Sequence, residues 1–139
     1  MGVSPLDLLG TWTLTRVVDD RREGERRDVA GSATLSEVGP DRVRWSEEGT
    51  MTWGERSVPV SRTLYVVRSV EQEWIVHFED GRVFHPWSVG ATVEHPCAPD
   101  HYTGRVDATG DPLDRWTVTW DAHGPGKDYR MVTVHTDRR

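Results

Sequence analysis

The stretch Leu9-Gly10-Thr11-Trp12-Thr13-Leu14-Thr15-Arg16 sets the pattern that the rest of the chain follows. Its large side chains alternate with threonines, and a period of two residues is typical of a β-strand with one buried face. Apart from one helical turn over Pro5–Leu9, no segment keeps a helical apolar period. Turn residues interrupt the alternation roughly every eight to twelve positions, most clearly at Gly39-Pro40, Asp80-Gly81, Gly110-Asp111-Pro112 and Gly124-Pro125-Gly126. The sequence therefore predicts an all-β protein.

About nine or ten antiparallel strands in one small domain must form a sandwich or close on themselves, and closure removes the exposed edges of the sheet. The start Gly10-Thr11-Trp12 resembles that of lipocalins and other calycins. In those proteins a short helical turn leads into the first strand, and the tryptophan fills the closed end of the barrel. We therefore expect residues 1–139 to form a single calycin-like domain, a closed or nearly closed antiparallel barrel with a short N-terminal helical turn.

Composition narrows the classes of partner and location. With 23 acidic and 17 basic side chains the net charge is −6, and an acidic protein lacks the positive field that non-specific nucleic-acid binding needs. No run of about 18 apolar residues predicts a membrane span, and Met1–Gly10 lacks the charged start and apolar stretch of a signal peptide. The single Cys97 excludes an internal disulfide and fits a reducing cytoplasm.

The basic residues are unevenly chosen. Sixteen of the 17 are arginine, and asparagine is absent, which indicates a GC-rich bacterial genome. Lys127 is the sole lysine. It is either a chance survivor or a position that needs a compact amine, which a planar guanidinium does not replace.

Asp80-Gly81 is a strong signal for a two-residue hairpin, because both residues tolerate the positive φ angles of a type I′ turn. The turn predicts that Phe78 faces Val83 and that Val76 faces His85. Cross-strand partners lie on one face of a sheet, so His85 falls on the apolar, inward face with Trp74, Val76, Phe78, Val83 and Trp87. A histidine there is either a hydrogen-bonded core residue or a titratable group in a pocket.

The last hairpin is interpreted in the same way. A four-residue loop over His123–Gly126 places Ala122 opposite Lys127 and Trp120 opposite Tyr129. Lys127 and Tyr129 then share the interior with Trp116 and Trp120. A loop one residue longer would turn Lys127 outward.

Three charged residues interrupt apolar stripes on their strands: Arg16, Glu47 and Arg62. Each is either a strand end that reaches water or a buried charge. A buried charge must be paired or must serve a ligand. These three residues and Lys127 could therefore compensate one another, and together they predict a polar-lined cavity.

The string His95-Pro96-Cys97-Ala98-Pro99-Asp100-His101-Tyr102 is the most unusual in the chain. Its two prolines predict a rigid connector near the barrel rim rather than a regular strand. We expect it to hold His95, Asp100 and Tyr102 toward the cavity. His, Cys and Asp are metal ligands, but their spacing here matches no zinc pattern and a second ligand pair is missing, so no metal site is predicted.

Three strings carry a second resemblance: Asp80-Gly81-Arg82-Val83-Phe84-His85, the string from His95 to Tyr102, and Gly124-Pro125-Gly126-Lys127-Asp128-Tyr129. With Gly10-x-Trp12, Arg16 and Trp45-x-Glu47-x-Gly49, they resemble an uncharacterised family of bacteria and eukaryotes, a domain of unknown function with a calycin-like barrel. The resemblance covers nearly the whole chain. It implies the barrel and a single site lined by the matched residues, and it implies no activity.

Three functions fit such a barrel. The sequence favours a cofactor-independent acid/base enzyme (an isomerase, cyclase, lyase or hydrolase) that acts on a small polar or anionic metabolite. The alternatives are a non-catalytic carrier or sensor of a small ligand and a haem-binding barrel with a histidine ligand. An interaction module with paired internal charges is the plainest reading, and a homodimer is left open.

The site residues follow from these hypotheses. The candidate catalytic residues are His85, His95, Lys127 and Tyr129. The candidate ligand-binding residues are Arg16, Glu47, Arg62, Asp100, Tyr102, Trp116 and Trp120.

Overall fold

The computed structural model describes residues 2–139 and contains one turn of 3-10 helix followed by ten strands. The predicted all-β class and the short N-terminal helical turn are confirmed. The elements are η1 Pro5–Leu8, β1 Gly10–Asp20, β2 Glu25–Gly39, β3 Arg42–Trp53, β4 Arg56–Arg68, β5 Trp74–Phe78, β6 Val83–Pro86, β7 Thr92–Cys97, β8 Asp100–Thr109, β9 Arg115–Gly124 and β10 Lys127–Thr136.

All ten strands belong to one sheet, in the order β6-β5-β4-β3-β2-β1-β10-β9-β8-β7. Because β1 pairs with β10, the first and last strands lie side by side, and the edges of the sheet are β6 and β7, which follow each other in the chain. The Nδ1 atom of His95 in β7 donates to the carbonyl oxygen of Phe84 in β6, at 2.8 Å, across the seam between these edges. The barrel is therefore nearly closed, as predicted.

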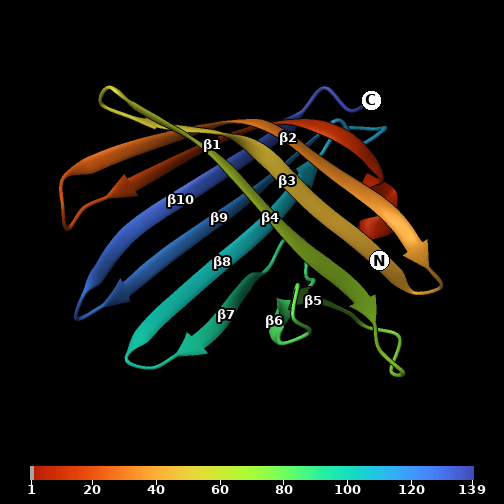
Figure 1. The fold of residues 1–139 in the computed structure, drawn as a ribbon. Helices are drawn as coiled ribbons and strands as arrows, with labels where there is room; N and C mark the ends of the chain where they lie inside the picture. The colour runs from red at the N-terminus through yellow and green to blue at the C-terminus, as the bar shows by residue number, and fades with distance from the viewer. Residues whose placement is uncertain (1) are drawn as a thin grey trace.

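The two ends of the barrel are built differently (Figure 1). At one end η1 contacts β2, and its start is stabilised by a capping box between Ser4 and Asp7. The indole N–H of Trp12, which is fully buried, donates to the carbonyl oxygen of Leu8 at 2.8 Å. This contact fills the closed end, as expected from the Gly-x-Trp start. The other end carries the β1–β2, β3–β4 and β9–β10 turns, and we call it the open end.

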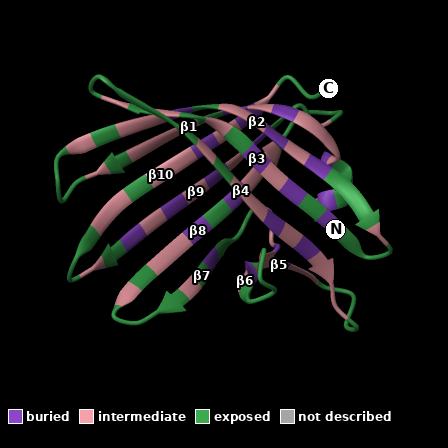
Figure 2. Cartoon of the chain, in the orientation of Figure 1, coloured by how far each residue is buried: buried purple, intermediate pink, exposed green. Residues whose placement is uncertain are grey.

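Side chains alternate between the interior and the surface along most of the strands, as Figure 2 shows in bands of purple against pink and green. The interior near the closed end is filled by four indoles, those of Trp12, Trp45, Trp87 and Trp116. Their ring centroids lie 5.3–6.4 Å apart in tilted and edge-to-face pairs, the arrangement that aromatic quadrupoles prefer. No helix within residues 2–139 is long and apolar enough to cross a membrane.

The β5–β6 hairpin confirms the central expectation for His85 and corrects one for Val83. Val76 faces His85, but the register then shifts by one residue, so that His77 rather than Phe78 faces Val83. The predicted two-residue turn at Asp80-Gly81 was wrong: Phe78 N–H donates to the Arg82 carbonyl oxygen, so the loop has three residues. Phe84 is the extra residue of the bulge, and it restores the facing of Val76 and His85. Val83 is 59% exposed, and the ring of Phe84 turns inward in its place and stacks on Phe78 at 4.5 Å between centroids. A bulge places two successive side chains on one face. The strand propensities of the residues do not predict a bulge.

Two further expectations about local structure were wrong. The β9–β10 turn has two residues, Pro125 and Gly126, so Lys127 faces Gly124 and Tyr129 faces Ala122. The shift is two residues, which keeps the predicted alternation of faces, but Lys127 lies exposed at the start of β10 rather than in the interior. The string beginning at His95 is no connector, because β7 runs to Cys97 and forms a hairpin with β8. Pro96 is tolerated there because β7 is an edge strand.

Candidate functional site

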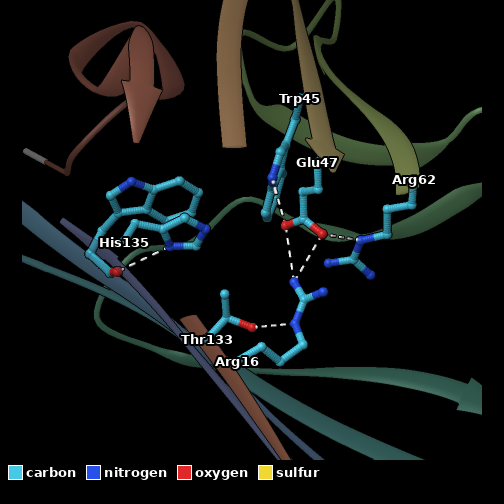
Figure 3. A network of polar contacts seen from close by, with 7 residues as sticks. Arg16, Trp45, Glu47, Arg62, Thr133 and His135 are labelled. Carbon is cyan, nitrogen blue, oxygen red and sulfur yellow. Dashed lines mark hydrogen bonds and ion pairs between the residues drawn. The ribbon is translucent and has the colours of Figure 1, made fainter. Parts of the chain in front are cut away.

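A buried carboxylate, that of Glu47, organises the polar part of the barrel interior (Figure 3). Glu47 projects inward from β3 and is 6% exposed. Arg16 Nη2 donates to both of its oxygens, at 2.9 and 3.0 Å. Arg62 Nε donates to Oε1 at 2.8 Å and Trp45 Nε1 to Oε2 at 3.1 Å. Three donor nitrogens thus make four hydrogen bonds to the carboxylate, which has about four lone-pair positions, so Glu47 is fully used as an acceptor.

The electrostatics of this cluster keep all three groups charged. Burial raises the pKa of the Glu47 carboxyl, but the charges of Arg62 and Arg16 outweigh burial, so its pKa lies below the ordinary value. Burial lowers the pKa of the Arg16 guanidinium, and the charge of Glu47 counteracts this. Two cations therefore surround one anion, and the cluster carries a net charge of +1.

The two guanidinium groups retain unused donors. Arg16 Nε donates to Thr133 Oγ1 at 2.7 Å, which leaves Nη1 without a hydrogen-bond partner among residues 2–139. Arg62 uses Nε alone, so both of its Nη atoms are unpaired within the described chain. The Arg62 side chain is 32% exposed and that of Arg16 11%. The free N–H groups are thus held in fixed positions by Glu47 and Thr133.

A cavity of about 100 Å³ lies directly beside these groups. Gly49 in β3 faces Gly31 in β2 at this level, and a Cβ at either glycine would run into the backbone of the opposite strand, so the two strands approach closely here. The lining combines apolar side chains with the charged cluster: Leu14, Arg16, Val29, Glu47, Glu48, Gly49, Met51, Val60, Ser61 and Arg62. Of the predicted site residues, three from three different strands therefore meet at one cavity.

His85 lies in the interior, as the hairpin register predicts, and is 2% exposed. Its Nδ1 atom donates to the carbonyl oxygen of Pro86 at 2.7 Å. The pKa of His85 is lowered to about 4, mainly by burial and also by the nearby His95 and Arg62, against the raising effect of the Pro86 bond. The imidazole is therefore neutral at neutral pH.

The predicted residues of the last hairpin gather at the open end. Lys127 Nζ donates to the Tyr102 hydroxyl and lies 3.5 Å from Asp100 Oδ2. This hydrogen bond with Tyr102 raises the pKa of Lys127. Tyr129 is half-buried, and burial raises the pKa of its hydroxyl. Lys127 is thus paired with Asp100 and Tyr102 and not with Glu47, and its side chain is 46% exposed.

The two predicted stacking tryptophans lie at different depths. Trp120 is 4% exposed and stacks on Phe84, at 5.0 Å between centroids, close to His85. Trp116 is fully buried among the closed-end indoles, with the His135 ring stacked on it at 3.6 Å. His95 is fixed by its bond across the seam and lies 5.8 Å from Tyr102 between ring centroids.

The sequence analysis did not predict two buried polar residues in β10, Thr133 and His135. Their signal was available, because both share the parity of Tyr129 and Met131. His135 Nδ1 donates to the Trp116 carbonyl oxygen at 3.1 Å, and burial lowers the pKa of His135 to about 4. Among the described residues no group of three or more His, Cys, Asp or Glu side chains is arranged to hold a metal ion.

Comparison with known proteins gives a family and a fold. A family model described as "Family of unknown function (DUF6314)" matches residues 8–137, and the chain belongs to this family. No curated protein matches the sequence.

Solved structures are similar in fold. An S-type phycobiliprotein lyase, CPES, from Guillardia theta has a TM-score of 0.65 at 15% identity, over 97% of this chain and 89% of the other. The redesigned β-barrel mFAP1, bound to DFHBI, has a TM-score of 0.54 at 11% identity, over 98% of this chain and 100% of the other. For the related barrel mFAP0, also bound to DFHBI, the TM-score is 0.51 at 13% identity, with 94% and 99% covered. At these identities the likeness concerns the fold alone.

Proposed function

We propose that this member of the DUF6314 family binds a small organic acid inside its barrel, with the carboxylate of the ligand held by the free guanidinium N–H groups of Arg62 and Arg16. One observation carries the proposal. The single carboxylate of the cluster accepts four hydrogen bonds from three donor nitrogens, while the two guanidinium groups beside the cavity still have unpaired N–H groups.

Arginine suits this role because its planar fork matches the geometry of a carboxylate and forms two parallel hydrogen bonds with it. Glu47 then acts as a positioning residue, because it orients both forks without meeting the ligand. The cluster of Arg16, Glu47 and Arg62 has a net positive charge that is partly exposed through Arg62, and the exposed Glu48 also lines the cavity. An anionic ligand would compensate the charge of the cluster.

The size of the cavity limits the ligand. An engineered cavity of about 150 Å³ in another protein binds benzene. The cavity here, of about 100 Å³, suits a short aliphatic acid or the acidic end of a longer molecule. Its apolar walls, from Leu14, Val29, Met51 and Val60, suit a short hydrocarbon chain. Barrels of similar fold bound to DFHBI support a ligand-binding role for this architecture.

The test is calorimetric titration of the full chain with propionate and butyrate. We expect Arg62→Gln to weaken binding about tenfold or more, because it removes a charged hydrogen-bond donor. Arg105→Gln is the matched control, since Arg105 forms an exposed pair with Asp107 on the outer surface of β8. Equal binding by the wild type and the Arg62 variant, or no binding by either, would refute the proposal.

Acid/base catalysis stays a prediction. The group that favours it most is the Tyr102 hydroxyl, which accepts a hydrogen bond from Lys127 beside Asp100. His85 favours it least, because a base with a pKa of about 4 is weak at neutral pH. An enzyme would lose turnover in a Tyr102→Phe variant and keep its binding of acid, whereas a carrier has no turnover to lose. The haem alternative also stays a prediction, which a Soret band in the absorption spectrum checks.

A further inference from the structure

The next row of inward side chains beside the cavity, toward the open end, contains two arginines and a tryptophan. Val29 in β2 and Met51 in β3 line the cavity and face each other. Side chains two residues apart on a strand share a face. Toward the turns, the next inward positions are therefore Arg27 in β2 and Trp53 in β3, and Trp53 faces Arg56 in β4. We call Arg27, Trp53 and Arg56 the rim cluster.

The rim cluster contacts the wall of the cavity. The Nη1 atom of Arg27 lies 4.0 Å from the sulfur of Met51, and Met51 lines the cavity. The guanidinium carbon of Arg27 lies 4.5 Å from the centroid of the Trp53 ring, and that of Arg56 lies 5.8 Å from the same ring. A ligand that extends out of the cavity along Met51 therefore meets the guanidinium of Arg27.

The arginines of the rim cluster have unused donors. Arg27 Nε forms an ion pair with Glu25 Oε1 at 3.3 Å, and the Met51 sulfur is only a weak acceptor. Among residues 2–139, Arg27 Nη2 has no hydrogen-bond partner and Arg56 forms no ion pair. A guanidinium stacked on an indole keeps its N–H groups in its own plane, where an anion can reach them. The Arg27 side chain is 40% exposed, so these groups are accessible.

The turns beside the rim cluster also carry carboxylates. Asp20 faces Glu25, and its Oδ1 atom accepts two main-chain N–H groups of the β1–β2 turn. Glu25 is paired with Arg27. Glu55 is exposed in the β3–β4 turn and forms no ion pair within the described chain. These acids would attract an ammonium group, whereas the contact of Arg27 with a cavity-lining residue favours an anion.

The strand register places the rim cluster within reach of a ligand held at the acid site. Arg16 faces Val29, and Arg27 is the next inward position beyond Val29. Adjacent inward positions on a strand are about 7 Å apart, so a few methylene groups bridge the two sites. The walls along this path are the apolar side chains of Val29 and Met51, which suit methylene groups.

We propose that the rim cluster is a second anion-binding subsite and that the preferred ligand is a dicarboxylic acid. One carboxylate is held by Arg62 and Arg16, and the other by Arg27. This inference rests on the proposed function and specifies the chemical class of its ligand.

The experiment compares acids of matched length. Glutarate, adipate and pimelate have the same numbers of carbons as valerate, hexanoate and heptanoate and carry one more carboxylate. A monocarboxylate leaves Arg27 in contact with water, whereas a dicarboxylate of fitting length adds a charge-assisted hydrogen bond to it. We expect at least one dicarboxylate to bind about tenfold more tightly than its matched monocarboxylate, with one molecule per chain.

Two variants of the full chain locate the second carboxylate by calorimetric titration. Arg27→Gln should lower the affinity for the dicarboxylate to that for the matched monocarboxylate. Arg26→Gln is the matched control, because it removes the same charge from the adjacent residue, which is exposed and paired with Asp28. The control should keep the preference for the dicarboxylate.

The outcomes separate this inference from the proposed function. Equal binding of both kinds of acid by the wild type, or a preference that survives in Arg27→Gln, would overturn the inference and leave the proposed function standing. An equal loss in Arg26→Gln would also overturn it, since the effect would then be one of long-range charge. Tighter binding of 6-aminohexanoate than of adipate would assign the rim to a cation and overturn it as well. Failure of every acid to bind the wild type would overturn both proposals.

A spectroscopic measurement on the wild type does not depend on how the arginine variants fold. The indole N–H resonance of Trp53, assigned by its loss in Trp53→Phe, reports on the rim cluster because Arg27 stacks on this ring. We expect it to shift on addition of the preferred dicarboxylate and to stay in place on addition of butyrate, which ends inside the cavity. An unmoved resonance with saturating dicarboxylate would count against the inference.

Discussion

The closed end and the middle of the barrel are enclosed by the same strands, whose side chains alternate between the interior and the surface. The two regions differ in which side chains fill the interior. The closed end is filled by edge-to-face indoles, and the N–H groups of Trp12 and Trp87 donate to the main chain of the N-terminal segment. In the middle of the barrel, the inward positions hold Arg16, Glu47 and Arg62 beside a cavity. Trp45 belongs to both regions, since its ring packs against Trp116 and its N–H donates to Glu47.

This difference indicates that stability and ligand binding depend on different parts of one interior. Indole packing removes a large apolar area from water, which stabilises the fold but leaves no room. The charged cluster costs desolvation free energy and offers donors that the protein itself does not use. Substitutions in the two regions should therefore differ in what they change.

The largest effect is expected at the closed end. Trp12→Ala should lower the free energy of unfolding by about 4 kcal/mol, because it opens a large cavity and leaves the Leu8 carbonyl oxygen without its donor. Urea unfolding followed by circular dichroism measures this. Trp53→Ala at the open end is the control, since Trp53 is only partly buried and stacks against Arg27. Equal losses in the two variants would contradict the division between the ends.

The next effect concerns the charged cluster. Glu47→Ala should cost about 3 kcal/mol, because it leaves two cations beside each other without their anion. The double variant Arg16→Met/Glu47→Leu should be more stable than Glu47→Ala, since it removes one cation together with the anion. Urea unfolding of both variants gives the comparison. A double variant less stable than Glu47→Ala would show that the network stabilises the fold beyond charge compensation.

A smaller effect is expected from acid. His85 and His135 each have a pKa of about 4 in the folded chain, against an ordinary value of 6.5. Above pH 6.5 both states are neutral, and between pH 6.5 and 4 the unfolded chain binds protons that the folded chain does not. The free energy of unfolding should therefore fall by about 2 kcal/mol per histidine between pH 7 and 5. Glu47, whose pKa is lowered, loses its contribution only below its ordinary value of 4.5.

Variants separate the two histidines. His85→Phe and His135→Phe should each remove about half of this acid sensitivity, which is measured by urea unfolding at pH 7 and 5. If the free energy of unfolding falls equally between pH 7 and 5 in both variants and in the wild type, the acid sensitivity belongs to other groups.

The smallest effect is expected at the open end. Lys127→Met removes a cation whose side chain is largely in water, and exposed pairs contribute little to stability. The urea midpoint should stay within error of the wild type. A clear shift would indicate that the bonds of Lys127 to Tyr102 and Asp100 hold the β9–β10 hairpin in place.

Much of the fold could be predicted because its signals are local. Alternation from Trp12 to Arg16 depends on the period of a strand alone. Val76 and His85 face each other as predicted, although the predicted two-residue turn at Asp80-Gly81 has three residues, because the extra residue of the bulge compensates for the longer loop. Parity also placed Glu47 and Tyr129 inside before any contact was known. The predictions were wrong where local structure depends on which strands are neighbours. The bulge at Phe84 and the edge position of Pro96 are both of this kind.

The site was only partly predictable. The sequence showed that Arg16, Glu47, Arg62 and Lys127 could compensate one another. Glu47 and Arg62 face each other in the β3–β4 hairpin, whereas the pairings of Arg16 and Lys127 depend on how more distant strands are staggered. Arg16 and Arg62 reach Glu47, while Lys127 reaches Asp100 and Tyr102 instead. The orientation of His85 was likewise inferred, while the carbonyl oxygen that selects its tautomer was not.

The alternation of inward and outward side chains along a strand depends on neighbouring residues. The primary structure alone therefore specifies the barrel class, the inward faces and the set of polar groups inside. Pairing of the first and last strands brings together Arg16 and Thr133, which face each other in the β1–β10 pair, and no local turn sets the register of that pair. Only the assembled barrel therefore determines that Glu47 is saturated and that Arg62 retains unpaired donors. That surplus, which is a property of the three-dimensional network, is the basis of the proposed acid site.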